Sequence, residues 1–145
     1  MNSHKLRTNN ILIPCYYCSY LASDAAPRFV RATVQSSSDI FVQWNRLQPC
    51  RDVNGNITHY QVQYQAQPTE TNCKDANVDL SIRSELVPGV FDRNGNATLT
   101  GLSYFTNYSI RVAAVNEEGD VGVYSEPIFE MTLEHSETSG VCCSL

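Results

Sequence analysis

The sequence has no long apolar run and few charged side chains. A helix that spans a bilayer needs a run of roughly 18 apolar residues. No apolar run in the 145-residue sequence approaches that length, so we expect no membrane span in this chain. That expectation leaves open an anchor in a longer parent protein. Charged residues make up 17% and hydrophobic residues 42%, which excludes disorder by charge repulsion and a coiled coil. The length suits one domain with flanks.

Catalytic side chains are also scarce. The three histidines are His4, His59 and His135, and none has a catalytic companion at a useful spacing. The sequence contains neither a glycine-rich phosphate-binding loop nor a Gly-x-Ser-x-Gly motif. We therefore predict that the chain is not an enzyme and that it binds no cofactor.

Metal ligands are poorly arranged. Cys15 and Cys18 could be combined with Cys142 and Cys143, but two adjacent cysteines cannot easily give two tetrahedral ligands to one zinc ion. The acidic turn at residues 117–120 lacks the alternating oxygen ligands of a calcium-binding loop. We expect no metal site.

The charge balance is acidic. The chain carries 10 basic and 15 acidic residues, for a net charge of -5. A nucleic-acid-binding surface needs the opposite excess, so we expect no nucleic-acid partner. The arginines are too scattered in sequence to indicate a heparin-binding stripe.

The first 26 residues differ from the rest. Lys5 and Arg7 precede the apolar stretch 11–18, and the small residues Ser23 and Ala25 follow, which is the order of a secretory signal. Pro14 and several polar residues dilute the apolar stretch, so a disordered leader or the start of a fragment is the alternative. We divide the chain into a leader (1–26), a domain (27–132) and a disordered tail (133–145).

Short alternating runs fill the middle of the chain. Apolar and polar residues alternate with period two in 40–45, 60–65 and 107–114, which predicts strands with one buried face each. A further run, 123–132, could pair back onto the third of these across the turn at 116–120. The dipeptides Asn54-Gly55 and Asn94-Gly95 are of the positive-φ kind that closes tight turns. No stretch shows a sustained helical period, so the domain is predicted to be all-β.

With these strands placed, residues 27–132 resemble a fibronectin type III domain. Pro27 stands where that family opens its first strand, and Trp44 ends the second strand where the family keeps its core tryptophan. Residues 54–64 look like the third strand, entered by a turn. The most specific likeness is the run 102–116, followed by Gly119, Gly122, Ser125 and Pro127. The resemblance implies an immunoglobulin-like, seven-stranded antiparallel β-sandwich.

A two-sheet sandwich needs apolar side chains that face a shared interior. The inward positions of the predicted strands supply them. Tyr108 would need a hydrogen-bond partner once buried, and a tyrosine corner provides one from backbone a few residues upstream. We assign these residues to the structural core: Trp44, Tyr60, Val62, Leu102, Tyr108, Ile110 and Val112.

Two segments, 46–53 and 66–75, look longer than the strands that they join require. Each contains one cysteine, and a Cys50–Cys73 disulfide would staple both segments to one end of the sheet. Under the chain-entropy model such a bond is worth about 3 kcal/mol, and it would indicate an oxidising compartment. The alternative is two unrelated thiols.

Three Asn-x-Ser/Thr sequons predict N-glycosylation at Asn56, Asn96 and Asn107. Asn56 and Asn96 each follow a glycine of a predicted turn. Asn107 precedes an inward tyrosine and should therefore face water, although its motif could be a by-product of the corner.

We expect a non-catalytic extracellular module of a cell-surface receptor or adhesion protein, which mediates protein–protein interaction or cell adhesion, or acts as a spacer between neighbouring modules. Contacts in this family usually come from loops at one end or from an exposed sheet face. This points to Arg51 and Lys74 in the enlarged segments, and to Glu117 and Glu118 as a second candidate. The alternatives are an ectodomain fragment of a receptor-type tyrosine phosphatase and an intracellular structural module.

Overall fold

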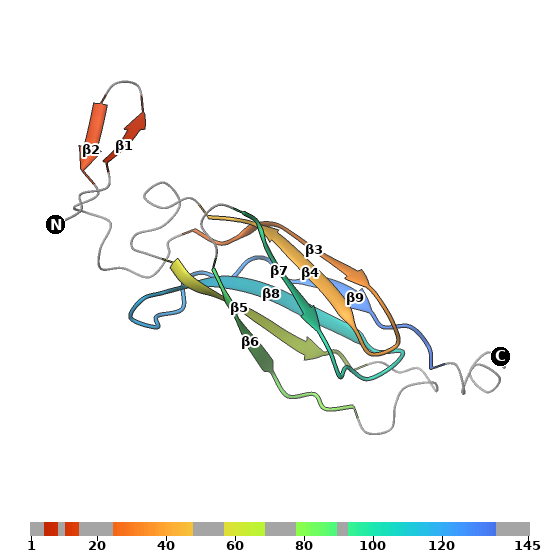
Figure 1. The fold of residues 1–145 in the computed structure, drawn as a ribbon. Helices are drawn as coiled ribbons and strands as arrows, with labels where there is room; N and C mark the ends of the chain where they lie inside the picture. The colour runs from red at the N-terminus through yellow and green to blue at the C-terminus, as the bar shows by residue number, and fades with distance from the viewer. Residues whose placement is uncertain are drawn as a thin grey trace.

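The computed structural model describes residues 5–8, 11–14, 25–47, 57–68, 78–89 and 93–135. Every regular element in these ranges is a β-strand, and the strands are drawn in Figure 1. In chain order they are β1 (Lys5–Thr8), β2 (Ile11–Pro14), β3 (Arg28–Val34), β4 (Ile40–Asn45), β5 (Ile57–Ala66), β6 (Arg83–Pro88), β7 (Gly95–Leu99), β8 (Asn107–Asn116) and β9 (Ile128–Met131).

Two antiparallel sheets face each other and form a β-sandwich (Figure 1). One is three-stranded with the order β3-β4-β7, and the other is four-stranded with the order β6-β5-β8-β9, which makes seven strands in the sandwich. The predicted all-β fold class is confirmed. The part of the chain that the structure describes contains no helix with the length and apolarity needed to cross a membrane.

The alternation of the sequence determines which side chains lie between the sheets. In β4, Ile40, Val42 and Trp44 are buried while Gln43 and Asn45 are exposed. Strand β5 repeats this pattern with Tyr60, Val62 and Tyr64 inward, and β8 repeats it with Tyr108, Ile110 and Val112. Each large side chain buried in this way contributes roughly 1.5–3 kcal/mol. All seven side chains that the sequence analysis assigned to the core are at most 6% exposed.

The chain between β8 and β9 pairs less than the sequence suggested. The alternating run 123–132 yields a strand only over Ile128–Met131, opposite Asn107–Ile110. Before it, the backbone is held to β8 by single hydrogen bonds, from Gly122 N to Ala114 O (2.9 Å) and from Ser125 N to Val112 O (2.8 Å). Pro127 has no N–H to donate to a ladder, which accounts for the late start of the strand.

After β9, the backbone of Leu133 forms hydrogen bonds on the sides of both sheets. Leu133 N donates a hydrogen bond to Ser36 O (3.2 Å), and Leu133 O accepts one from Phe105 N (3.0 Å). Ser36 follows β3 of the three-stranded sheet, whereas Phe105 precedes β8 of the four-stranded sheet. Leu133 is thus hydrogen-bonded to the backbone of both sheets' connections.

An additional hairpin precedes the sandwich. A disordered leader was one of the alternatives for residues 1–26, but β1 and β2 pair antiparallel from Lys5↔Pro14 to Thr8↔Ile11. Only two residues separate the strands in sequence, and two is the commonest length for a hairpin connection. The sequence alone does not indicate this hairpin, because the order of basic, apolar and small residues in the leader also matches a signal peptide.

Candidate functional site

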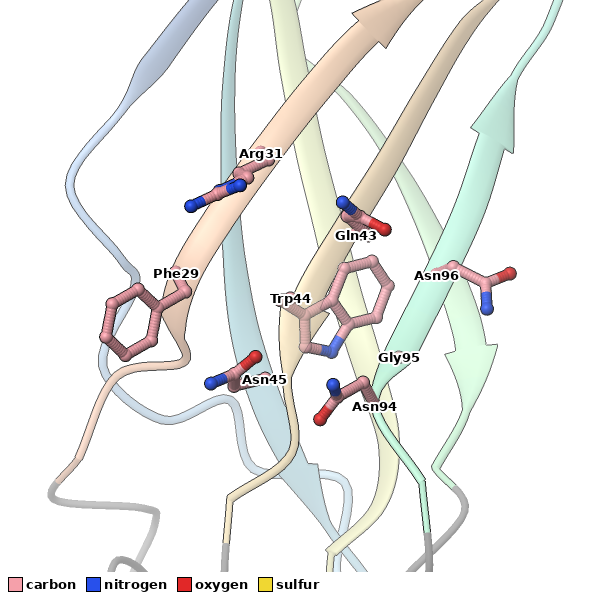
Figure 2. A pocket seen from close by; sticks show the side chains of 8 residues that line it. All are labelled: Phe29, Arg31, Gln43, Trp44, Asn45, Asn94, Gly95 and Asn96. Atoms are coloured by element: carbon pink, nitrogen blue, oxygen red, sulfur yellow. The ribbon is translucent and has the colours of Figure 1, made fainter.

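An open hollow of about 370 Å³ lies on the β3-β4-β7 sheet, towards the end of β4 (Figure 2). Its lining consists mainly of side-chain amides, with one guanidinium and one exposed aromatic ring. The residues are Phe29, Arg31, Gln43, Trp44, Asn45, Asn94, Gly95 and Asn96. These groups can hydrogen bond or stack on a ligand, but the lining holds no carboxylate, imidazole, thiol or hydroxyl for acid–base or nucleophilic work.

The base of the hollow is formed by Trp44 against Gly95. These residues are cross-strand partners, and a Cβ added to Gly95 would lie closer than 3.0 Å to the indole ring. The prediction of a positive-φ turn at Asn94-Gly95 is wrong, because the positive-φ glycines among the described residues are Gly101 and Gly119. Gly95 opens strand β7, and the indole occupies the space where a side chain would be.

Behind the hollow, Trp44 packs on Tyr60. The two ring centroids are 5.3 Å apart at an interplanar angle of 60°, which is a favourable tilted arrangement. Tyr60 Oη accepts a hydrogen bond from Leu47 N (3.1 Å), and burial raises the pKa of this phenol. Within the described residues, Trp44 Nε1 is a buried donor with no hydrogen-bond acceptor. This cluster therefore serves packing, because its one available polar atom is sealed from solvent.

A tyrosine corner joins the two sheets at the other end. Ser103 N donates a hydrogen bond to Tyr108 Oη (2.9 Å), five residues downstream, which is the bond that the sequence analysis expected. Leu102 packs beside it and is 6% exposed. Thr132 completes the corner, since its Oγ1 accepts from Thr106 N (2.9 Å) and donates to Ser103 O (2.7 Å). These hydrogen bonds give the corner residues a structural role.

Tyr108→Phe tests this corner. The variant leaves Ser103 N without its acceptor, so we expect the free energy of unfolding to fall by about 1–3 kcal/mol with no change in fold. Chemical denaturation followed by far-UV circular dichroism measures the change. The control is Tyr104→Phe, whose hydroxyl makes no described hydrogen bond. Equal effects of the two variants would contradict the role assigned to the Ser103–Tyr108 bond.

The outward surface of β6-β5-β8-β9, which we call the outer face, carries an ordered polar centre. Gln63 and Arg111 are register partners on β5 and β8, and Arg111 Nε donates a hydrogen bond to Gln63 Oε1 (2.7 Å). The guanidinium carbon of Arg111 lies 4.3 Å from the ring centroid of Tyr124. A hydrogen bond and a cation–π contact thus hold an exposed arginine in one orientation.

Large apolar side chains flank this centre on the outer face. Leu86 on β6 is 63% exposed, and on β9 Phe129 and Met131 are 57% and 41% exposed. Their register partners are Gln61, Ser109 and Asn107 in the same sheet. Aromatic, methionine and arginine side chains are the types enriched at protein–protein interfaces. The outer face therefore has the composition of a binding surface.

The sequence matches the Fibronectin type III domain family over residues 25–131. The chain belongs to this family. Protein sidekick-2 of Mus musculus is 33% identical over 110 residues, and Protein sidekick-2 of Gallus gallus is 32% identical over the same length. Each match covers 76% of this chain but 4% of the relative, so the chain spans a small part of these proteins.

Solved fibronectin type III domains have the same fold. The fn3 domain of human contactin 1 aligns with a TM-score of 0.60 and 25% identity, over 81% of this chain and 85% of that one. The FN5 domain of Drosophila Lar aligns with a TM-score of 0.53 and 24% identity, over 77% of this chain and 99% of that one, which shows the fold alone.

Several predicted site residues of this fibronectin type III domain lie outside the described residues. They are Cys50, Arg51, Asn56, Cys73 and Lys74. The predicted disulfide and the predicted contacts of the enlarged segments thus stay predictions, as does glycosylation of Asn56.

The acidic turn after β8 is described. Asn116 closes it, with hydrogen bonds from Asp120 N to Asn116 Oδ1 (2.7 Å) and from Gly119 N to Asn116 O (3.1 Å). Gly119 has a φ of 87°, which suits glycine, and Glu117 and Glu118 are exposed. Among the residues that the structure describes, no three His, Cys, Asp or Glu side chains are grouped to hold a metal ion.

The two described sequons occupy different positions. Asn96 is exposed on β7, at the edge of its sheet, whereas Asn107 is half-buried on β8, between β5 and β9. The Arg111–Gln63–Tyr124 cluster was missed by the sequence analysis. Three outward glutamines in β5 were a signal for a polar face, but the pairing of Gln63 with Arg111 depends on a register between distant strands.

Proposed function

We propose that this fibronectin type III domain is a non-catalytic, extracellular protein-binding module of a cell-surface protein. Family membership and the similarity to segments of sidekick-2 and contactin 1 support this role. The expected Cys50–Cys73 bond and the three sequons agree with an oxidising, glycosylating compartment. The module also separates whatever precedes it from whatever follows it, so spacing and binding are compatible functions.

The observation that carries the binding role is the outer face. Arg111 is already held by Gln63 and Tyr124 before any partner arrives, so little side-chain entropy is lost when it forms a contact. Leu86, Phe129 and Met131 offer apolar surface on either side of this cation. A central arginine and an aromatic ring surrounded by apolar groups is a typical arrangement of an interface hot spot.

The predicted loop contacts form a second part of the same proposal. Glu117 and Glu118 are exposed where β8 ends, and Arg51 and Lys74 belong to the enlarged segments. We propose that these charges select among partners, since exposed charges at the rim of an interface alter association rate and specificity more than affinity.

A binding screen tests the proposal. The secreted domain is presented as an oligomer to an array of cell-surface ectodomains, and each hit is measured with the wild type, Arg111→Ala and Tyr124→Ala. We expect each substitution to weaken binding about tenfold or more. Arg31→Ala is the matched control, because Arg31 is also exposed but lies on β3 of the opposite sheet.

Two results would contradict the proposed function. Unchanged affinity in Arg111→Ala and Tyr124→Ala together with a loss in Arg31→Ala would move the binding surface to the other sheet. Free thiols at both Cys50 and Cys73 in protein isolated from its native cells, with all three sequon asparagines unmodified, would favour the intracellular structural module.

A further inference from the structure

Among the residues that the structure describes, four strands of the sandwich lie at the edge of a sheet. They are β3 and β7 in the three-stranded sheet, and β6 and β9 in the four-stranded sheet. A free edge exposes unpaired N–H and C=O groups that can pair with another chain, and proteins usually block it with charge, proline, a bulge or a very short strand.

Strand β3 is blocked by an irregular backbone and by charge. Its pairing with β4 shifts register between Arg28 and Arg31, and Phe29 within this bulge has a φ of 54°. A bulge bends and twists an edge away from a flat partner, and two arginine side chains add repulsion against a second copy.

Strand β6 is blocked by inward charges. Arg83 and Glu85 point towards the interior at the open side of the sandwich, where both contact Tyr64. The Arg83 guanidinium lies 5.1 Å from the Tyr64 ring centroid, and Tyr64 Oη donates to Glu85 Oε1 at 3.4 Å. Extending the sheet past β6 would bury this pair of charges, which is unfavourable.

Strand β9 is short and partly covered. It has four residues, one of them Glu130, and Pro127 directly precedes it. The next residues are committed, because Leu133 binds the backbone of Ser36 and Phe105. Few unpaired backbone N–H and C=O groups are left on this edge.

Strand β7 has none of these devices. Its sequence Gly95-Asn96-Ala97-Thr98-Leu99 contains no charge and no proline, and it pairs with β4 in unbroken register from Leu99 to Gly95. What it does contain is a sequon. Asn96 and Thr98 are both exposed, and Figure 2 shows the Asn96 amide directed away from β4, past the edge of the sheet.

We propose that Asn96 carries an N-linked glycan and that this glycan blocks the free edge of β7 against pairing with a second copy of the domain. The inference rests on the extracellular location in the proposed function. A hydrated oligosaccharide attached at the second residue of this five-residue edge strand occupies the volume that a fourth strand added to the sheet would need. A glycan on Asn96 would therefore account for the lack of charge and proline on this edge strand.

The modification is an ordinary group transfer. Asn96 Nδ2 forms a bond to C1 of the first sugar of a lipid diphosphate-linked oligosaccharide, and the bond from C1 to the diphosphate oxygen breaks. The amide loses one proton, and the lipid diphosphate is the leaving group. Thr98 supplies the hydroxyl that the sequon requires. No described hydrogen bond engages the Asn96 side chain in the folded domain, so the glycan displaces no contact there.

Asn107 provides the contrast. Strand β8 pairs with β5 on one side and β9 on the other, so Asn107 has no free edge beside it. A glycan on Asn107 would project from the sheet face. Loss of the Asn107 sequon should therefore not change self-association.

Occupancy is tested on the full chain secreted behind a heterologous signal sequence, so that the result does not depend on the native destination of the protein. Peptide mass spectrometry after enzymatic glycan release should find Asn96 converted to aspartate. Asn96→Gln should lose this signal, while Asn107→Gln should retain it. An unmodified Asn96 in the secreted chain overturns the proposal without affecting the proposed binding function, which the ectodomain screen tests separately.

The edge function is tested with two substitutions at one position. Thr98→Ala removes the glycan and leaves the edge neutral, whereas Thr98→Lys removes the glycan and adds a charge that blocks pairing. Analytical ultracentrifugation should find the wild type and Thr98→Lys monomeric, and Thr98→Ala associated, with an increase in average mass of about twofold. Trimming the wild-type glycan to one sugar checks the result without a substitution. A monomeric Thr98→Ala domain overturns the edge function.

Discussion

Trp44→Ala is expected to lower the free energy of unfolding by about 3–5 kcal/mol. The indole is 1% exposed, packs on Tyr60 at a centroid separation of 5.3 Å and covers Gly95, so its removal leaves a cavity between the two sheets. Denaturation should be followed by far-UV circular dichroism, because Trp44 is the only tryptophan and its own fluorescence disappears in the variant.

The matched control for this prediction is Phe41→Ala. Phe41 is on the same strand but on the outward side, where it is only half-buried. We expect its loss to cost about 1 kcal/mol or less, because the side chain is partly hydrated in the folded state. A loss from Trp44→Ala no larger than this would show that the interior near the hollow is not closely packed around the indole.

Gly95→Ala is the second large effect that we expect. The new methyl group would overlap the Trp44 ring, and neither the ring nor the paired β7 backbone can move far. Overpacking of this kind costs about 1–3 kcal/mol, and occasionally more. The effect differs in origin from Gly119→Ala, where space is open and the positive φ is the difficulty.

A double-mutant cycle separates the two origins. In a Trp44→Phe background the smaller ring leaves room for the methyl group, so Gly95→Ala should cost much less there than in the wild type. Gly119→Ala should cost the same in both backgrounds, because no atom of Trp44 lies within 4 Å of a Cβ added at Gly119. Additive effects of Gly95→Ala and Trp44→Phe would contradict the assigned contact.

The strands of this fold could be predicted because their patterns are local. In β4, β5 and β8 the inward residues are apolar, except for Asn116 at the end of β8, and most outward residues are polar, so period two is visible without knowledge of partners. The tyrosine corner was also predictable, since Ser103 and Tyr108 are five residues apart in sequence. A buried phenol needs a hydrogen-bond partner, and the nearby backbone N–H of Ser103 provides it.

Features that depend on pairing between distant strands could not be predicted. Asn94-Gly95 has the composition of a turn, and only the cross-strand position of Trp44 shows why Gly95 is needed in a strand. By its position in the alternation Ala113 should face outward, yet it is fully buried. It lies between Gln61 on β5 and the segment 122–125, which is hydrogen-bonded to β8. The composition of the outer face likewise depends on register.

The ties of Leu133 to both sheets matter for mechanical load. If the domain is linked in series with others, tension enters near β3 and leaves after β9. The hydrogen bonds of Leu133 with Ser36 and Phe105 lie in that path, so the pull is shared by both sheets instead of peeling β9 from β8 alone. Forced unfolding is governed by the unfolding rate, and bonds that must break together slow that rate more than bonds broken one at a time. In such a series, the hydrogen bonds of Leu133 would therefore slow forced unfolding of the domain.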